Sequence, residues 1–212
     1  MDNMTLPPSI APMLAQPGTP FDSAEHLFEV KWDGMRALAY IDAGGYRIVS
    51  RHGNHITDRF PELGSLANLP PGTVLDGELV VLRAGRPDFS LLQTRAPLCC
   101  QHKIRTLART TPATYVVFDQ LFERYRSLMD EPLSTRREVM LNTIDRAGQQ
   151  VIASDGVVGP GRSFYDHVVG QQLEGVVAKR LASRYLPGRR TGAWIKIKPA
   201  VHRPPPGRRT PQ

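Results

Sequence analysis

Alternation of apolar and polar residues predicts a chain built mainly from short β-strands. Residues 28–33 alternate strictly, so their apolar side chains fall on one face of a strand and their charged side chains on the other. Residues 36–41 and 46–50 lie on either side of Asp42-Ala43-Gly44-Gly45, a sequence typical of a hairpin turn. The same criteria predict further strands over residues 74–82, 115–122, 175–178 and 193–197.

Helical signals lie between these strands. Thr135 and Glu138 form a capping-box pair ahead of an apolar run that ends before Gly148. Ser163 is placed to cap a short helix over residues 164–169. Strands joined in hairpins, with helices inserted between them, favour the α+β class with largely antiparallel sheets.

The two ends of the chain differ in composition from the part between them. Residues 1–20 hold five prolines and show no sustained period, which predicts an extended N-terminal arm. Residues 200–212 are rich in proline and arginine, a composition typical of a disordered basic tail. Residues 21–199 are therefore predicted to form the folded domain.

Overall composition indicates a globular protein. With 212 residues, 41% of them hydrophobic and 22% charged, the chain is long enough to bury a sizeable core. It has no apolar run of about 18 residues and no export signal, so we expect no membrane span and a cytoplasmic location. Cys99 and Cys100 are adjacent and are expected to stay reduced. The six histidines lack the spacing of metal ligands.

The net charge of +7 is unevenly distributed. Residues 1–178 carry 17 Lys and Arg together with all 20 Asp and Glu, whereas residues 179–212 carry 10 Lys and Arg and no acid. A basic segment of this density is typical of contact with the phosphates of nucleic acid or of a nucleotide. It is also compatible with a solvated basic tail, so charge alone leaves the two interpretations open.

Lys31 is the strongest candidate for a nucleophile. It lies between Glu29 and Asp33 on the polar side of the predicted strand, and a glycine turn and Arg36 follow. A lysine in this setting attacks as an amine if nearby cations keep it neutral. Taken alone, the pattern is more typical of a surface ion pair.

Four further charged residues make that chemistry more specific. Glu78 and Glu174 each interrupt an apolar strand, where an unpaired carboxylate is costly to bury, and a divalent cation would satisfy both. Lys196 and Lys198 are two residues apart in a strand and therefore share a face. Together these groups could bind a triphosphate around Lys31.

Six segments, taken in chain order, resemble the motif set of the covalent nucleotidyltransferases. They are K-x-D-G-x-R at residues 31–36, S-R-x-G at 50–53, D-G-E at 76–78, F-D at 118–119, E-G at 174–175 and K-x-K at 196–198. Within that superfamily, the chain resembles the adenylation domain of ATP-dependent DNA ligases of the bacterial end-joining and repair type. The bacterial character rests on residues 20–23, 88–95 and 185–190.

This resemblance implies two antiparallel β-sheets flanked by helices, with the nucleotide bound between the sheets. It implies that Lys31 attacks the α-phosphate of ATP to form lysyl-AMP, which then serves to seal nicks in double-stranded DNA during repair. It also implies that Glu29 accepts from the adenine amine and that Phe118 stacks on the adenine ring. Ribose and phosphate oxygens would be held by Arg36, Arg51 and Arg190. Mg²⁺ near the phosphate would be bound by Glu78 and Glu174, and the charge that develops on the phosphate would be neutralised by Lys196 and Lys198.

Lys179 is expected to lie outside the nucleotide site. Counting by twos along the predicted strand places Lys179 on the face opposite Glu174. Contact with a DNA phosphate or with solvent is therefore expected for it.

The resemblance also raises the question of partners. Ligases of this type continue past the two-lysine motif into an OB-fold domain, and residues 199–212 are too few to build one. We therefore expect an OB-fold domain or a repair protein from another chain to be a partner, beside nicked DNA. Two alternatives remain: a non-catalytic, truncated nucleic-acid-binding remnant, and an RNA ligase or capping-type nucleotidyltransferase.

Overall fold

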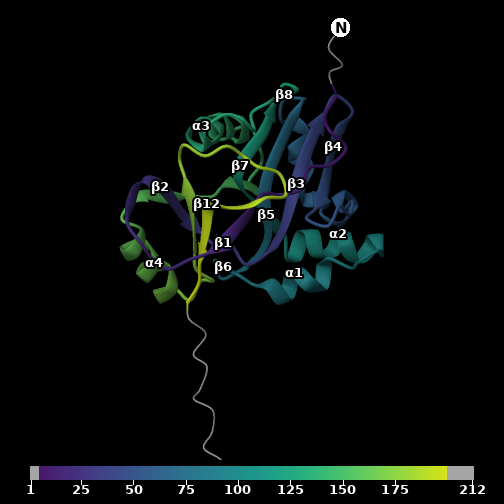
Figure 1. Ribbon diagram of the computed structural model, residues 1–212. Helices are drawn as coiled ribbons and strands as arrows, with labels where there is room; N and C mark the ends of the chain where they lie inside the picture. The colour runs from purple at the N-terminus through teal and green to yellow at the C-terminus, as the bar shows by residue number, and fades with distance from the viewer. Residues whose placement is uncertain (1–4, 200–212) are drawn as a thin grey trace, which may run out of the picture.

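The computed structural model describes residues 5–199, which contain two β-sheets and the helices that flank them (Figure 1). The smaller sheet has five strands. Their order is β1 (Leu14–Pro17), β12 (Arg190–Ile197), β11 (Val176–Arg180), β2 (Ser23–Val30) and β10 (Gly156–Gly159). All neighbours are antiparallel except β1 and β12, so part of the predicted N-terminal arm forms a parallel edge strand. The tail predicted over residues 200–212 lies outside the described residues.

The larger sheet has seven strands. Its main path is β4 (Gly45–Ser50), β3 (Met35–Asp42), β5 (Thr73–Arg83), β7 (Ala113–Glu123) and β8 (Arg126–Ser127). Two short strands join it at the side, β6 (Arg86–Pro87) on β5 and β9 (Val151–Ala153), which runs parallel to β7. The hairpin predicted around residues 42–45 is confirmed, because β3 and β4 pair up to Asp42 and Gly45.

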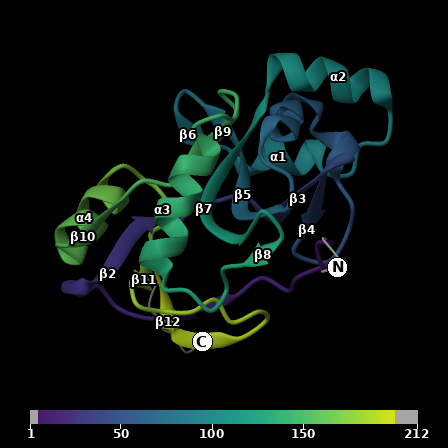
Figure 2. The same cartoon turned by 90° about the horizontal axis from the view of Figure 1, so that it is seen from above.

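The helices lie outside the two sheets (Figure 2). α4 covers the smaller sheet, α3 packs against β7, and α1 and α2 lie on the opposite side of the molecule from α4. Their bounds are α1 (Phe89–Arg95), α2 (Gln101–Thr110), α3 (Leu133–Ile144) and α4 (Gly161–Gly170), with 3₁₀ turns at η1 (Thr57–Arg59) and η2 (Pro61–Asn68). Among residues 5–199, none of these helices has the length and apolar character to cross a membrane.

Both predicted helix starts are wrong by three residues. α3 begins at Leu133 and α4 at Gly161, so Thr135 and Ser163 lie inside the helices and do not cap them. In each case a proline precedes the helix, and its carbonyl accepts the first helical hydrogen bond, at 3.1 Å from the amides of Arg136 and Phe164. A proline side chain cannot accept a hydrogen bond, so amides of the first turns bond to other segments: that of Ser134 donates to the carbonyl of Leu181, and that of Arg162 donates to Oδ1 of Asp22.

Three apolar clusters hold the layers together. One lies on the outer face of the larger sheet, under η2, α1 and α3, and one joins α4 to the smaller sheet. The third fills the space between the sheets and contains Leu38, Tyr40, Phe118, Tyr185 and Trp194. Because strand residues alternate between faces, the larger sheet directs one set of side chains toward the smaller sheet.

Strand register brings the motif residues to that shared face. In the larger sheet, Arg36 of β3 is paired with Glu78 of β5. In the smaller sheet, Val177 of β11 lies between Glu29 of β2 and Lys196 of β12. The motif residues of the larger sheet and those of the smaller sheet therefore face each other across the space between the two sheets.

Candidate active site

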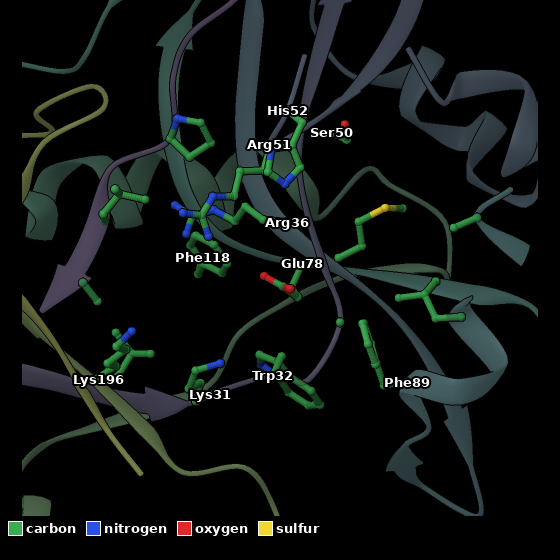
Figure 3. A pocket seen from close by; sticks show the side chains of 18 of the residues that line it. Lys31, Trp32, Arg36, Ser50, Arg51, His52, Glu78, Phe89, Phe118 and Lys196 are labelled. Atoms are coloured by element: carbon green, nitrogen blue, oxygen red, sulfur yellow. The ribbon is translucent and has the colours of Figure 1, made fainter. Parts of the chain in front are cut away.

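A cavity of about 740 Å³ lies between the two sheets (Figure 3). In the close-up, Arg36, Glu78 and Lys31 point into the same space, with Lys196 on the side of the smaller sheet. The structure brings together nine of the ten candidate residues on the cavity wall: Glu29, Lys31, Arg36, Arg51, Glu78, Phe118, Arg190, Lys196 and Lys198. The tenth, Glu174, adjoins the cavity through ion pairs with two of them.

Lys31 lies just beyond the end of β2, which begins five residues before the strand predicted over residues 28–33 and ends three residues before its predicted end. Its backbone amide donates to the carbonyl of Gly175 at 2.8 Å. Its Nζ atom lies 2.5 Å from Oε2 of Glu174, and the other oxygen of Glu174 pairs with Lys198. Partial burial opposes ionisation of Glu174, but the hydrogen bonds from Lys198 and Lys31 bring its pKa below the usual value.

Two glycines allow the backbone to approach closely around Lys31. A Cβ atom on Gly34 would lie 2.2 Å from the carbonyl oxygen of Leu79 and 2.9 Å from Cγ of Glu78. Gly175 has a φ of +135°, and a Cβ there would lie 2.1 Å from the carbonyl oxygen of Ile197. Glycine is the residue that tolerates both conditions.

Replacing Gly175 with alanine is expected to lower the free energy of unfolding by about 1–3 kcal/mol, because alanine is strained at this φ. The same change shifts Glu174, so the ion pair with Lys31 weakens. Urea unfolding measures the first effect. Gly44→Ala is the matched control, since a Cβ on Gly44 meets nothing within 4 Å. Equal stability of the two variants would contradict the prediction.

Arg36 is fixed by a carboxylate on the neighbouring strand. Its Nε and Nη2 atoms each donate to Asp76 at 2.6 Å, and the hydroxyl of Tyr185 donates to the same carboxylate at 2.7 Å. Burial opposes the charge of Arg36, but Asp76 raises its pKa above the ordinary value. The guanidinium carbon lies 4.6 Å from the ring centroid of Phe118. Arg36 is therefore a permanently charged, pre-oriented group on the cavity wall.

The carboxylate of Glu78 points into the cavity (Figure 3). Burial raises its pKa to about 7, although Arg36 and Lys31 act in the opposite direction. Within residues 5–199 it forms no salt bridge. A carboxylate that is buried and has no salt-bridge partner among these residues is available to a cationic ligand.

Glu29 is already held on both sides. It is buried, and its Oε1 atom accepts a hydrogen bond from Arg137 of α3 at 2.7 Å, while Oε2 pairs with Lys179. Burial raises the pKa of Glu29, against the effect of these two cations.

The prediction for Lys179 is wrong. The side chain is 3% exposed and lies on the cavity wall, paired with Glu29 and 4.0 Å from the ring centroid of Phe118. Counting from Glu174 fails because β11 begins only at Val176, after the left-handed turn at Gly175. Within the strand, Val177 and Lys179 face the cavity, and Val176 and Ala178 face the α4 cluster.

The remaining candidates form a cationic rim. Arg51 follows β4 and its amide donates to the carbonyl of Arg36 at 3.0 Å, while the side chain of Arg190 bonds to the carbonyl of Ala15. Slight burial lowers the pKa of Lys196, and Arg190, Lys198 and Lys31 lower it further. This accumulation of positive charge suits a polyphosphate.

Sequence reasoning missed several residues that support the site. Asp76 and Tyr185 orient Arg36, and Arg137 orients Glu29. Asp76 was visible as part of the D-G-E segment, but its partner lies on another strand. Arg137 follows a buried arginine on α3, and nothing in the local pattern indicates that it reaches β2.

Comparisons with known proteins show which sequences and structures this chain is similar to. The family model for the ATP dependent DNA ligase domain matches residues 12–198. The multifunctional non-homologous end joining protein LigD of Mycolicibacterium smegmatis is 36% identical over 197 residues, which cover 91% of this chain and 24% of LigD. The SPbeta prophage-derived DNA ligase-like protein LigB of Bacillus subtilis is 30% identical over 190 residues, covering 89% of this chain and 67% of LigB.

A solved structure described as mycobacterial DNA ligase D complexed with ATP and MES has a TM-score of 0.75 and 33% identity. The match covers 90% of this chain and 60% of that chain. The predicted fold class is therefore confirmed. The chain spans about a quarter of the length of the LigD proteins that it matches. With the family model matched over residues 12–198, the chain belongs to the family of ATP-dependent DNA ligase domains.

Proposed function

We propose that this chain adenylates itself on Lys31 with ATP and passes the AMP to the 5′-phosphate of nicked double-stranded DNA. The observation that carries the proposal is the position of Lys31 in the cavity between the sheets. There a lysine amine, a free carboxylate on Glu78 and the cations of Arg36 and Lys196 line one space. A nucleophile surrounded by phosphate-binding groups suits transfer of a nucleotidyl group.

The first step forms a bond between Nζ of Lys31 and the α-phosphorus of ATP. The bond from that phosphorus to the bridging oxygen breaks and pyrophosphate leaves with the electron pair. The ammonium of Lys31 gives up one proton to become the attacking amine and a second as the bond forms, and both pass to water. In the second step an oxygen of the DNA 5′-phosphate displaces Lys31 from the AMP phosphorus. The 3′-hydroxyl then attacks the activated 5′-phosphate, which closes the strand and releases AMP.

The chain's own residues have separable tasks in these steps. Arg36, held by Asp76, Arg51 and Arg190 would bind ribose and phosphate oxygens. Lys196 and Lys198 would balance the charge that develops on the α-phosphate. Phe118 and Glu29 are buried residues of the cavity wall and would hold the adenine ring and its amine.

The donors present fit a magnesium ion that is shared with the nucleotide. Residues 5–199 contain no group of three or more His, Cys, Asp or Glu side chains placed to hold a metal alone. Mg²⁺ commonly takes one or two carboxylates and completes its coordination with phosphates and water. Glu78, with its free carboxylate, and Glu174 would supply them, and the ion would neutralise phosphate charge.

Replacing Glu78 or Glu174 with glutamine is expected to lower the rate of Mg²⁺-dependent adenylation at least about tenfold, a loss of about 1.4 kcal/mol of transition-state stabilisation. Titrating Mg²⁺ for each variant measures the effect. Glu138→Gln, at an exposed position of α3, is the matched control. If the wild type and the three variants gave identical Mg²⁺ curves, Glu78 and Glu174 would have structural roles only.

Incubation with α-³²P-labelled ATP and Mg²⁺, followed by denaturing electrophoresis, tests the proposal. A phosphoramide survives denaturation, whereas bound ATP does not. Binding of nicked DNA without any label would instead favour the non-catalytic remnant. Label from GTP in place of ATP would favour a capping-type enzyme, and sealing restricted to RNA would favour an RNA ligase.

The proposal extends to partners and location. Nicked double-stranded DNA is the proposed substrate, and an OB-fold domain or a repair protein is the proposed protein partner. Adding candidate partners to the labelling and sealing reactions tests this part. Because ATP and nicked DNA occur together in the cytoplasm, that is where we propose the reaction takes place.

A further inference from the structure

Arg137 connects helix α3 to Glu29 on the cavity wall. Its Nη1 atom donates to Oε1 of Glu29 at 2.7 Å, and its Nη2 atom donates to the carbonyl of Ser154 at 2.6 Å. The Arg137 side chain is 15% exposed and that of Glu29 is 2% exposed. One guanidinium therefore fixes the carboxylate of β2 to the segment that follows β9.

The ionisation of Glu29 depends on a small set of charges. Lys179 of β11 and Arg137 of α3 lower the pKa of Glu29, while burial, the largest influence, and Asp119 of β7 raise it. The charge of Asp119 is itself balanced by Arg136, which contacts it through two hydrogen bonds of 2.8 Å. Two cations that contact the carboxylate thus offset part of the effect of burial and favour its ionised form, although the pKa of Glu29 stays above its usual value.

We propose that Arg137 is a positioning residue that sets nucleobase selectivity by holding Glu29 as an ionised acceptor at the base site. The inference deepens the proposed function and rests on it, since Glu29 is there assigned to the 6-amino group of adenine. A purine with a 6-oxo group presents an acceptor at the same place. An ionised carboxylate cannot donate to that oxygen, whereas a protonated carboxyl can.

The geometry requires an arginine at this position. A guanidinium presents several donors in a fixed plane and so bridges Glu29 and Ser154 at once. A lysine would keep the positive charge near Glu29 but offers a single ammonium group on a flexible chain. The conservative variant Arg137→Lys therefore separates the charge effect from the positioning effect.

Covalent labelling with ATP and with inosine triphosphate tests the inference, because the two bases differ at position 6. The measured quantity is the ratio of the ATP rate to the inosine triphosphate rate, which cancels changes common to both nucleotides. For Arg137→Ala we expect this ratio to fall at least about tenfold relative to the wild type. Arg137→Lys is expected to fall between the two. Arg126→Ala, which breaks the exposed Arg126–Glu131 pair, is the matched control and is expected to keep the wild-type ratio.

The pH dependence supplies a readout that a purely structural role would not change. Without Arg137 the pKa of Glu29 rises further, so the carboxyl binds a proton as the pH falls. In Arg137→Ala, the ratio is therefore expected to drop from about pH 9 to about pH 6 and to recover on return to alkaline pH. In Glu29→Gln, the amide donates at every pH, so the ratio is expected to be low and independent of pH.

An Arg137→Ala protein that loses both rates equally, or keeps the wild-type ratio, would overturn the inference while leaving the proposed function intact. If Arg137→Ala fails to fold, the Arg137→Lys and Glu29→Gln proteins decide: wild-type ratios in both refute a role for this contact. A wild-type chain that forms no adduct with either nucleotide refutes the proposed function, and the inference falls with it.

Discussion

Replacing Lys31 with alanine is expected to reduce covalent labelling by ATP at least about a thousandfold, because removing a nucleophile stops the step that other groups only assist. Lys31→Arg is expected to fail equally, since its guanidinium stays protonated. Digestion of the labelled wild-type protein and mass spectrometry of its peptides should locate the AMP on Lys31. The fold should persist in both variants, because the Lys31 side chain is partly exposed and its backbone bond to Gly175 remains.

Lys103→Ala is the matched control for this experiment. Lys103 is exposed on α2 and has no salt bridge within residues 5–199, so its loss should leave labelling unchanged. Recovery of AMP on a different residue of the wild-type protein, or normal labelling of Lys31→Ala, would show that the proposed nucleophile is wrong. Both outcomes are visible on the same gel and peptide map.

The strands around Lys31 could be predicted because their signals are local. Alternation over residues 28–30 and the turn at residues 42–45 depend on neighbours in the chain, and both are present in the structure. The parallel strand β1 was missed because its partner, β12, begins more than 170 residues later. A proline-rich segment carries no local sign that it will join a sheet edge.

The site was predictable as a set of residues but not as a set of contacts. Motif spacing identified nine of the side chains that line the cavity. It did not identify Asp76 behind Arg36 or Arg137 behind Glu29, since these pairs form between different elements. The error on Lys179 has a single physical cause, the left-handed glycine that interrupts the alternation before β11.

The second large effect concerns the buried ion pair between Asp119 of β7 and Arg136 of α3. Both side chains are 0% exposed, and two hydrogen bonds of 2.8 Å join them. Arg136 also donates to the carbonyls of Glu131 and Ser183, at 2.7 Å and 2.8 Å. Asp119→Ala leaves a guanidinium buried without its counter-charge, so we expect the free energy of unfolding to fall by about 3–5 kcal/mol.

Urea unfolding of Asp119→Ala and Arg126→Ala compares a buried pair with an exposed one. Arg126→Ala should change the free energy of unfolding by less than about 1 kcal/mol, because solvent screens the Arg126–Glu131 pair. The double variant Asp119→Leu/Arg136→Met should lose less stability than Asp119→Ala, since it leaves no charge unpaired. A double variant that is the least stable of the three would show that the hydrogen bonds to Glu131 and Ser183, rather than charge pairing, hold α3 on the sheet.

Because Phe118 and Arg137 are the adjacent residues, Asp119→Ala should also reduce labelling by ATP under conditions in which the protein remains folded.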